Sequence, residues 1–142
     1  MSTQHVGLMA LKPILQTART IAVLGVSANT DKPAHFVPLY AAQREYRVIP
    51  INPLLVGQTL FGEPVRASLA ELNEPVDIVD IFRRAEMLPD HLNDILAMTP
   101  RPKLVWLQLG IKNDEFAAKL LEAGIDVVQD RCLLADHRTL GL

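Results

Sequence analysis

Residues 20–33 read TIAVLGVSANTDKP: an apolar run ends at Gly25, a loop of small and polar residues follows, and a proline suits the first turn of a helix. The segment 20–43 is therefore predicted to form a strand, a loop and a helix. A helix N-terminus that follows a tight turn of small residues presents free amides and the positive end of the helix dipole, which together bind phosphate. The same pattern also occurs in β–α turns that hold no ligand, so the loop alone leaves both interpretations open.

Short apolar runs alternate with segments of helical period along the whole chain. Five strands are predicted, at residues 20–26, 46–51, 76–82, 103–109 and 125–129. Their nearly continuous hydrophobic character is typical of parallel strands that are covered on both faces. The prediction is an α/β fold, a single-domain Rossmann-like doubly wound parallel five-stranded sheet with helices on both faces, over residues 1–142 with its core at about 20–140.

Helix signals separate these strands. An N-terminal helix is expected at residues 8–17, and Ser68 with Glu71 forms a capping-box pattern at the start of another helix. Asn113 is predicted to cap a later helix that ends at Gly124. A further apolar stripe at helical spacing consists of Leu88, Leu92, Ile95 and Leu96.

The composition of the 142 residues is that of a globular protein, with 49% hydrophobic and 21% charged residues. The net charge of −2 argues against a nucleic-acid-binding protein, which normally carries a clustered basic face. The single cysteine, Cys132, excludes an intrachain disulfide. No apolar run reaches the ~18 residues of a membrane span and no signal-peptide pattern begins the chain, so we expect a cytoplasmic protein that binds no membrane.

The side chains give no catalytic or metal-binding pattern. The four histidines lack metal-ligand spacing, and the sequence around Ser27 lacks the second glycine of a nucleophile elbow. Asp77 and Asp80 are three residues apart on a predicted strand, so they face opposite sides and form no carboxylate pair. Cys132 is interpreted as a small hydrophobe rather than a nucleophile. No catalytic residue and no metal ligand is assigned, and enzymatic activity is left open.

Ligands of doubly wound sheets bind beyond the carboxyl ends of the strands, so the residues after each strand carry the functional prediction. The second strand ends in Asn52 and Pro53, where an NAD site would place Asp or Glu. Asn52 can donate and accept, which suits a ribose or a base edge, although Asn-Pro is also a common turn. The missing acid disfavours NAD in either case.

Aromatic and basic residues follow the third strand, as Phe82, Arg83 and Arg84. Arginine binds phosphate in a bidentate manner, and Phe82 is suited to lie against an adenine. For Arg83, a phosphate contact and a solvated position are left as alternatives, whereas Arg84 is expected at the surface. Near the end of the fourth strand, Gln108 either faces the site or marks the end of the strand, and Trp106 is expected in the core.

The order and spacing of these motifs resemble the small stand-alone CoA-binding proteins and the N-terminal CoA-binding domain of the succinyl-CoA synthetase α subunit. The resemblance covers residues 14–140 and is carried by IAVLGVS (21–27), YRVIPINP (46–53), VDIVDIFR (76–83), VWLQLG (105–110) and DRC (130–132). It implies a Rossmann-like fold that binds coenzyme A at the carboxyl edge of the sheet.

Carried over by matching position, the resemblance implies specific site residues. It places Gly25, Ser27 and Asn29 on the phosphates with Lys32 nearby, Asn52 and Pro53 near the adenosine, and Phe82 and Arg83 flanking it; Gln108 completes the predicted site. Two departures matter. Leu54 stands where a basic residue commonly follows Asn-Pro, and the synthetases carry a phosphorylated histidine on a second domain that this chain is not expected to have. Ligase chemistry is therefore expected to be absent.

Three functions follow as alternatives. The first is a protein that binds coenzyme A or an acyl-CoA without catalysis of its own. The second is an NAD(H)-binding enzyme or redox sensor on the same fold, and the third is a partner-binding module whose first loop contacts a protein. Nucleic acid and membrane are not expected partners. A homo-oligomer, a partner protein and a mixed disulfide between Cys132 and the CoA thiol are left open.

Overall fold

The computed structural model describes residues 2–142, and its main sheet has six parallel strands in the order β1-β8-β7-β6-β2-β3. Their bounds are β1 (Gln4–His5), β2 (Thr20–Leu24), β3 (Arg47–Ile51), β6 (Ile78–Ile81), β7 (Leu104–Leu107) and β8 (Asp126–Val128). The doubly wound fold and all five predicted strands are confirmed, each strand one to three residues shorter than predicted. The predicted number of strands is wrong, because β1 pairs with β8 at the edge and is too short to give a periodic signal.

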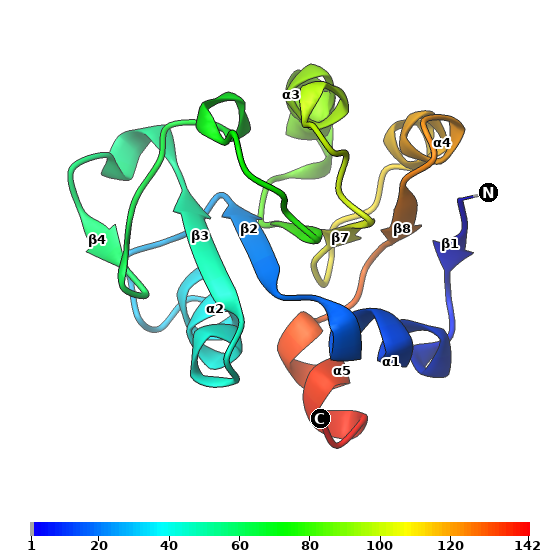
Figure 1. The fold of residues 1–142 in the computed structure, drawn as a ribbon, viewed down its shortest axis with the longest axis horizontal. Helices are drawn as coiled ribbons and strands as arrows, with labels where there is room; N and C mark the ends of the chain where they lie inside the picture. Colours follow the sequence, from blue (N-terminus) through cyan, green and yellow to red (C-terminus); the bar gives the residue numbers. More distant parts are fainter. Residues whose placement is uncertain (1) are drawn as a thin grey trace.

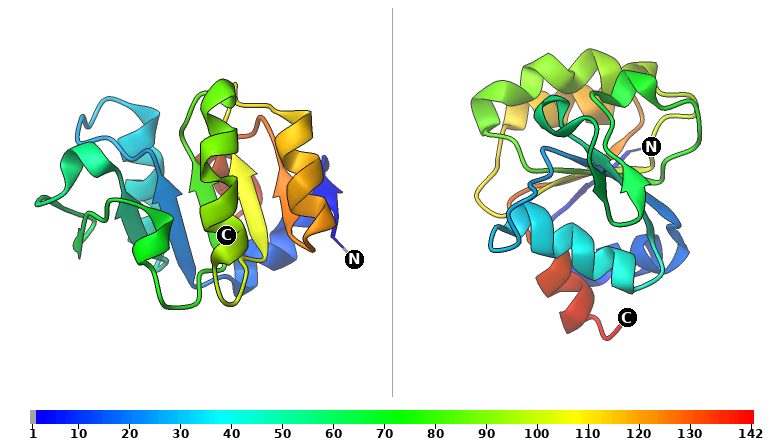
Figure 2. Two further views of the ribbon diagram at one scale, coloured as in Figure 1. Left: turned by 90° about the horizontal axis from the view of Figure 1, so that it is seen from above. Right: turned by 90° about the vertical axis from the view of Figure 1, so that its left-hand side faces the viewer.

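Helices cover both faces of the sheet, as predicted. The helices α1 (Leu8–Thr17), α2 (Pro33–Gln43) and α5 (Leu133–Thr139) lie on one face, and α3 (Leu92–Ala97) and α4 (Asp114–Glu122) lie on the other (Figures 1 and 2). The two faces bury separate apolar clusters, with Ile21 and Val23 in one and Ala22 and Leu24 in the other. The near-continuous apolar strands are explained by this double burial. No helix among the described residues has the length and apolarity to cross a membrane.

Two of the predicted helix boundaries are confirmed, and the predicted capping box is wrong. Asn113 caps α4 by accepting a hydrogen bond from the Phe116 amide at 3.0 Å, and Gly124 follows the helix with φ +85°, so both predictions are confirmed. Ser68 makes no side-chain cap, and only the 3-10 turn η2 (Leu69–Glu71) follows it, while the Glu71 carboxylate accepts from the amide of Ala67.

The predicted apolar stripe at residues 88–96 is divided between two elements. A 3-10 segment, η3 (Ala85–His91), precedes α3. Pro89 lies inside η3, where its missing N–H and its ring disfavour an α-helix. The short η1 (Pro53–Leu55) and the hairpin of β4 (Thr59–Leu60) and β5 (Glu63–Pro64) were not predicted.

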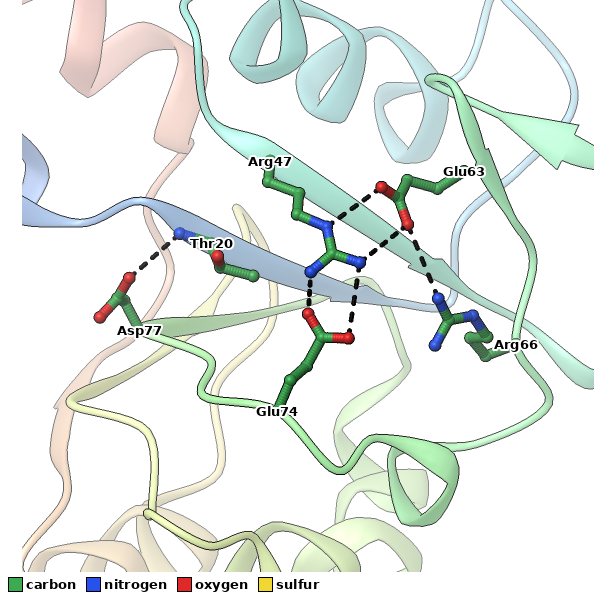
Figure 3. A network of polar contacts seen from close by, with 6 residues as sticks. All are labelled: Thr20, Arg47, Glu63, Arg66, Glu74 and Asp77. Atoms are coloured by element: carbon green, nitrogen blue, oxygen red, sulfur yellow. Dashed lines mark hydrogen bonds and ion pairs between the residues drawn. The ribbon is translucent and has the colours of Figure 1, made fainter.

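A polar network holds the loops at the amino ends of the central strands (Figure 3). Arg47, at the start of β3, donates to the carboxylate of Glu63 on β5 at 3.1 Å and also to Glu74, which precedes β6. The hydrogen bond from Arg47 lowers the pKa of Glu63. Asp77 accepts from the backbone amide of Thr20 at 3.0 Å. These contacts lie at the opposite end of the strands from the residues that were predicted to bind a ligand.

The direction of winding reverses at β2, which pairs with β3 on one side and β6 on the other. The connections that follow β2 and β6 leave the sheet in opposite directions. The loops after these two strands are therefore separated, which opens a crevice at the carboxyl ends of the strands. The loops concerned begin at Gly25, after β2, and at Phe82, after β6. The topology therefore places the first predicted loop at the switch point of the sheet.

Candidate functional site

The backbones of Gly25 and Phe82 meet at the switch point. The amide of Phe82 donates to the carbonyl of Leu24 at 2.8 Å, and the amide of Gly25 donates to the carbonyl of Ile51 at 2.9 Å. Gly25 has φ +87°, and a Cβ atom there would overlap the carbonyl oxygen of Phe82 and lie 3.1 Å from Cδ of Arg83. Glycine is needed at this position for both its conformation and its lack of a side chain.

The loop after β2 is shaped by its own side chains. Ser27 Oγ accepts from the amide of Asn29 at 3.0 Å, and Asn29 Oδ1 accepts from the amide of Asp31 at 3.0 Å. Nδ1 of His35, on α2, lies 2.8 Å from the carbonyl oxygen of Ser27. Ser27 and Asn29 thus hold the loop in place, a contribution that the sequence-based assignment to the phosphates did not include.

Asn52 connects the loops after β2 and β3. Its Nδ2 donates to the carbonyl of Val26 at 2.8 Å, and its Oδ1 accepts from the amide of Leu54 at 2.9 Å. Pro53 begins η1 and is exposed. The amide group of Asn52 is therefore already engaged on both sides, which explains why an amide rather than an acid stands at this position.

A first cavity, of about 490 Å³, lies along the loop after β2. It is bordered by Gly25, Lys32, Ala34, Asn52 and Phe82 together with the rest of the loop. Helix α2 starts at this cavity without a side-chain cap. The backbone amides of Ala28 and Ala34, which line the cavity, donate to no acceptor among residues 2–142. The geometry offers an anion two free amides and the positive end of a helix.

A second cavity, of about 700 Å³, lies on the other side of Phe82. Its walls come from α2, from the segment after β6 and from the loop after β7. Lys32, Ala34 and Phe82 border both cavities, so the two are adjacent. A ligand longer than a nucleotide can extend from one cavity into the other across Phe82.

Arg83 lies between the larger cavity and a small one of about 90 Å³ that Gly25 and Asn52 also line. Its Nε donates to Nε2 of His91 at 3.3 Å. Burial, and then the charge of Arg83, lower the pKa of His91. Arg84 is exposed and lies 3.8 Å from the carboxylate of Glu86, as expected for a surface arginine. The structure thus brings one predicted arginine into the site, beside a histidine that sequence reasoning missed.

Gln108 faces the larger cavity from the end of β7. The side chain is buried, and its Oε1 accepts from the amide of Leu133 at 3.2 Å. Cys132 is half-buried and borders the same cavity. Trp106 is fully buried and donates through Nε1 to the carbonyl of Arg131 at 2.8 Å, which confirms its predicted place in the core.

The structure brings most of the predicted residues to one edge but adds several that the sequence did not indicate. Phe36, Leu109 and Ile111 line the larger cavity, and His91 lines the small one. Phe36 and His91 are placed by the packing of α2 and η3, whereas Leu109 and Ile111 lie at or just after the end of a predicted strand and so carried a local signal. Among residues 2–142 no group of three or more His, Cys, Asp or Glu side chains is placed to share a metal ion.

The topology defines a Rossmann-like protein, and the crevice at its switch point is the candidate ligand site. The chain belongs to the CoA binding domain family, which matches residues 19–138. It is 36% identical over 127 residues to the uncharacterized protein YneT of Bacillus subtilis (strain 168), an alignment that covers 89% of this chain and 91% of YneT.

Solved structures share the fold of this chain. The structure of cell-free ID.343 from Thermus thermophilus has a TM-score of 0.90 and 50% sequence identity, over 95% of this chain and 99% of that chain. A hypothetical protein from Pyrococcus horikoshii OT3 has a TM-score of 0.88, covering 100% of this chain and 97% of that chain. At 24% identity this second likeness supports the fold alone.

Proposed function

We propose that this protein binds coenzyme A or an acyl-CoA at the carboxyl edge of the sheet and has no catalytic activity of its own. The observation that carries the proposal is the uncapped start of α2 beside a cavity at the switch point that Ala28 and Ala34 line, since the amides of these two residues donate to no acceptor among residues 2–142. Membership of the CoA binding domain family supports this ligand.

Binding is accounted for by the chain's own groups. The phosphates take the first cavity, where the free amides and Lys32 compensate their charge. Arg83, beside Gly25, adds a charge-assisted hydrogen bond. Phe82 lies between the two cavities, and the pantetheine arm passes over it toward Gln108. Ser27, Asn29, Asn52 and Pro53 hold the loops that border the first cavity.

The test is a comparison of CoA, acetyl-CoA, NADH and ATP by calorimetry and thermal shift with the purified protein. We expect saturable binding of the CoA compounds, and a ligand at 100 times its Kd raises stability by about 2.7 kcal/mol. No CoA binding at millimolar ligand contradicts the proposal. A protein partner for the loop becomes the better explanation if no compound binds.

The competing NAD(H) function is disfavoured by the engagement of Asn52. An NAD site uses a carboxylate at this strand end to bind the ribose hydroxyls. Here Nδ2 of Asn52 donates to the Val26 carbonyl. A carboxylate at this position would place two hydrogen-bond acceptors in contact with no donor between them. A clear energy-transfer signal between Trp106 and bound NADH would favour the NAD(H) function over CoA binding.

A further inference from the structure

We propose that the larger cavity holds the acyl end of an acyl-CoA, with an aliphatic chain against its apolar wall and the thioester carbonyl hydrogen-bonded to Gln108. This inference rests on the proposed function, since the CoA part of the ligand sets the entry to the cavity. It goes further by naming the ligand as a fatty acyl thioester rather than free CoA.

The wall of the larger cavity is apolar where it meets solvent. Phe36 is 40% exposed and Leu109 is 71% exposed, although both are large hydrophobic residues. They border the cavity together with Val37 and Ile111. Exposed apolar surface gathered around a hollow indicates a binding groove rather than a random surface position. An aliphatic chain would cover this surface.

Gln108 provides one unused donor in this apolar surrounding. Its Oε1 is fixed by the Leu133 amide, whereas its Nε2 donates to no group among residues 2–142. Asp80 Oδ1 is the one fully buried polar side-chain atom without a partner in the described chain, so Nε2 of Gln108 is open to the cavity. A donor that is open to a cavity is paired there either with water or with an acceptor of a bound ligand. A thioester carbonyl can accept this hydrogen bond, and it carries no donor group that would itself need an acceptor.

Charged residues also border the larger cavity. They are Lys32, Arg83, Arg84 and Glu86. Lys32 and Arg83 are assigned to the phosphates above, and Arg84 lies beside Glu86 at 3.8 Å. An acyl group with a terminal carboxylate is therefore the competing ligand, because Arg84 is the cation within its reach. The two acyl classes are separated by direct measurement.

The first experiment measures Kd by calorimetry for CoA and for acetyl-, butanoyl-, hexanoyl- and succinyl-CoA. Burying one methylene strengthens binding by up to about fourfold, so the affinity is expected to rise from acetyl- to hexanoyl-CoA. Leu109→Ser should flatten this rise, and Val6→Ser, at an 80% exposed residue that does not border the larger cavity, should leave it unchanged. Succinyl-CoA binding more tightly than butanoyl-CoA overturns the aliphatic assignment.

The second experiment isolates the carbonyl contact. S-Hexyl-CoA, a thioether, has the chain of hexanoyl-CoA but no carbonyl. The wild type should prefer the thioester by about two- to tenfold, the range expected for a neutral hydrogen bond. Gln108→Met should abolish this preference, while Gln58→Met, at an exposed residue elsewhere, should keep it. A preference that persists in Gln108→Met overturns the role of Gln108.

The outcomes distinguish this inference from the proposed function. If CoA binds and the acyl chain adds nothing, the inference fails and the CoA site stands. If neither CoA nor any acyl-CoA binds, the proposed function fails as well. Because Gln108→Met removes the acceptor of the Leu133 amide, its folding is checked by circular dichroism and urea unfolding before the two affinities are compared.

Discussion

The Cα of Gly25 faces the carbonyl oxygen of Phe82 so closely that no side-chain atom fits between them. This contact joins the carboxyl ends of β2 and β6, the two strands between which the sheet reverses its winding. The first loop and the Phe82–Arg83 pair are thereby placed side by side. Gly25 and Phe82, 57 positions apart in the sequence, become one wall of the site because the intervening β3 unit winds to the opposite side.

Gly25→Ala should lower the free energy of unfolding by about 2–5 kcal/mol. Left-handed backbone costs a non-glycine residue ~1–2 kcal/mol, and overpacking adds ~1–3 kcal/mol. The matched control is Gly124→Ala, since Gly124 has φ +85° but open space around its Cβ position. It should lose only the conformational part, ~1–2 kcal/mol, in urea unfolding. Equal losses in the two variants would show that the contact with Phe82 is not a constraint.

Arg83→Ala should weaken CoA binding by roughly tenfold or more, because a charge-assisted hydrogen bond contributes ~1.5–3 kcal/mol. Arg84→Ala removes the same charge from the neighbouring exposed position, which pairs with Glu86, and should change the CoA affinity by less than about threefold. Calorimetry at one ionic strength measures both. A similar loss in the two variants would indicate a diffuse charge effect rather than a phosphate contact at Arg83.

CoA binding should be linked to protonation of His91. In the free protein, burial and the charge of Arg83 keep the pKa of His91 below its ordinary value. A phosphate beside Arg83 would raise that pKa, so the complex would bind more protons than the free protein. The affinity should then increase as the pH falls from the pKa in the complex toward the lower pKa in the free protein.

This linkage is measured by calorimetry in buffers of different ionisation enthalpy. The CoA 3′-phosphate also titrates, so His91→Gln is the necessary reference, and the proton uptake of the wild type should exceed that of the variant. Identical uptake in the two proteins would place the phosphates away from Arg83 and His91.

Asp80→Asn should stabilise the protein near neutral pH. Asp80 lies in the middle of the sheet between Val23 and Trp106, its Oδ1 has no hydrogen-bond partner among residues 2–142, and burial raises its pKa well above the ordinary value. The folded state therefore holds a proton that the unfolded chain releases. Stability should fall as the pH rises from the ordinary carboxyl pKa to the raised one, by at most about 1.4 kcal/mol per pH unit.

The control for Asp80→Asn is Asp77→Asn, which is expected to change the stability in the opposite direction. Burial acts to raise the pKa of Asp77, but hydrogen bonds from the backbone amides of Arg19 and Thr20, together with the charge of Lys103, outweigh it and lower the pKa. Its ionised form stabilises the fold above the ordinary carboxyl pKa, so Asp77→Asn should destabilise the protein at neutral pH. Urea unfolding from pH 5 to 8 compares the variants, and a wild-type-like pH slope in Asp80→Asn would contradict the prediction.

The local sequence determined the features that depend on neighbours along the chain. The apolar runs specified five parallel strands, Asn113 and Gly124 marked the ends of α4, and Gly25 marked the turn after the first predicted strand. Each of these signals acts through backbone conformation or burial of adjacent residues. Ser68 and Glu71 show the limit of such signals, since a correct capping pattern gave only a 3-10 turn, with Glu71 bonded to Ala67 instead.

Tertiary structure alone decided the contacts between distant segments. Strand β1 exists because β8 offers an open edge, and Asn52 is engaged because Val26 presents a carbonyl to it. The pairing of Arg83 with His91 and the direction of the Gln108 amide likewise depend on segments placed by packing. The first loop was recognisable from its residues, but which of its amides are free was settled only by the hydrogen bonds of the folded chain.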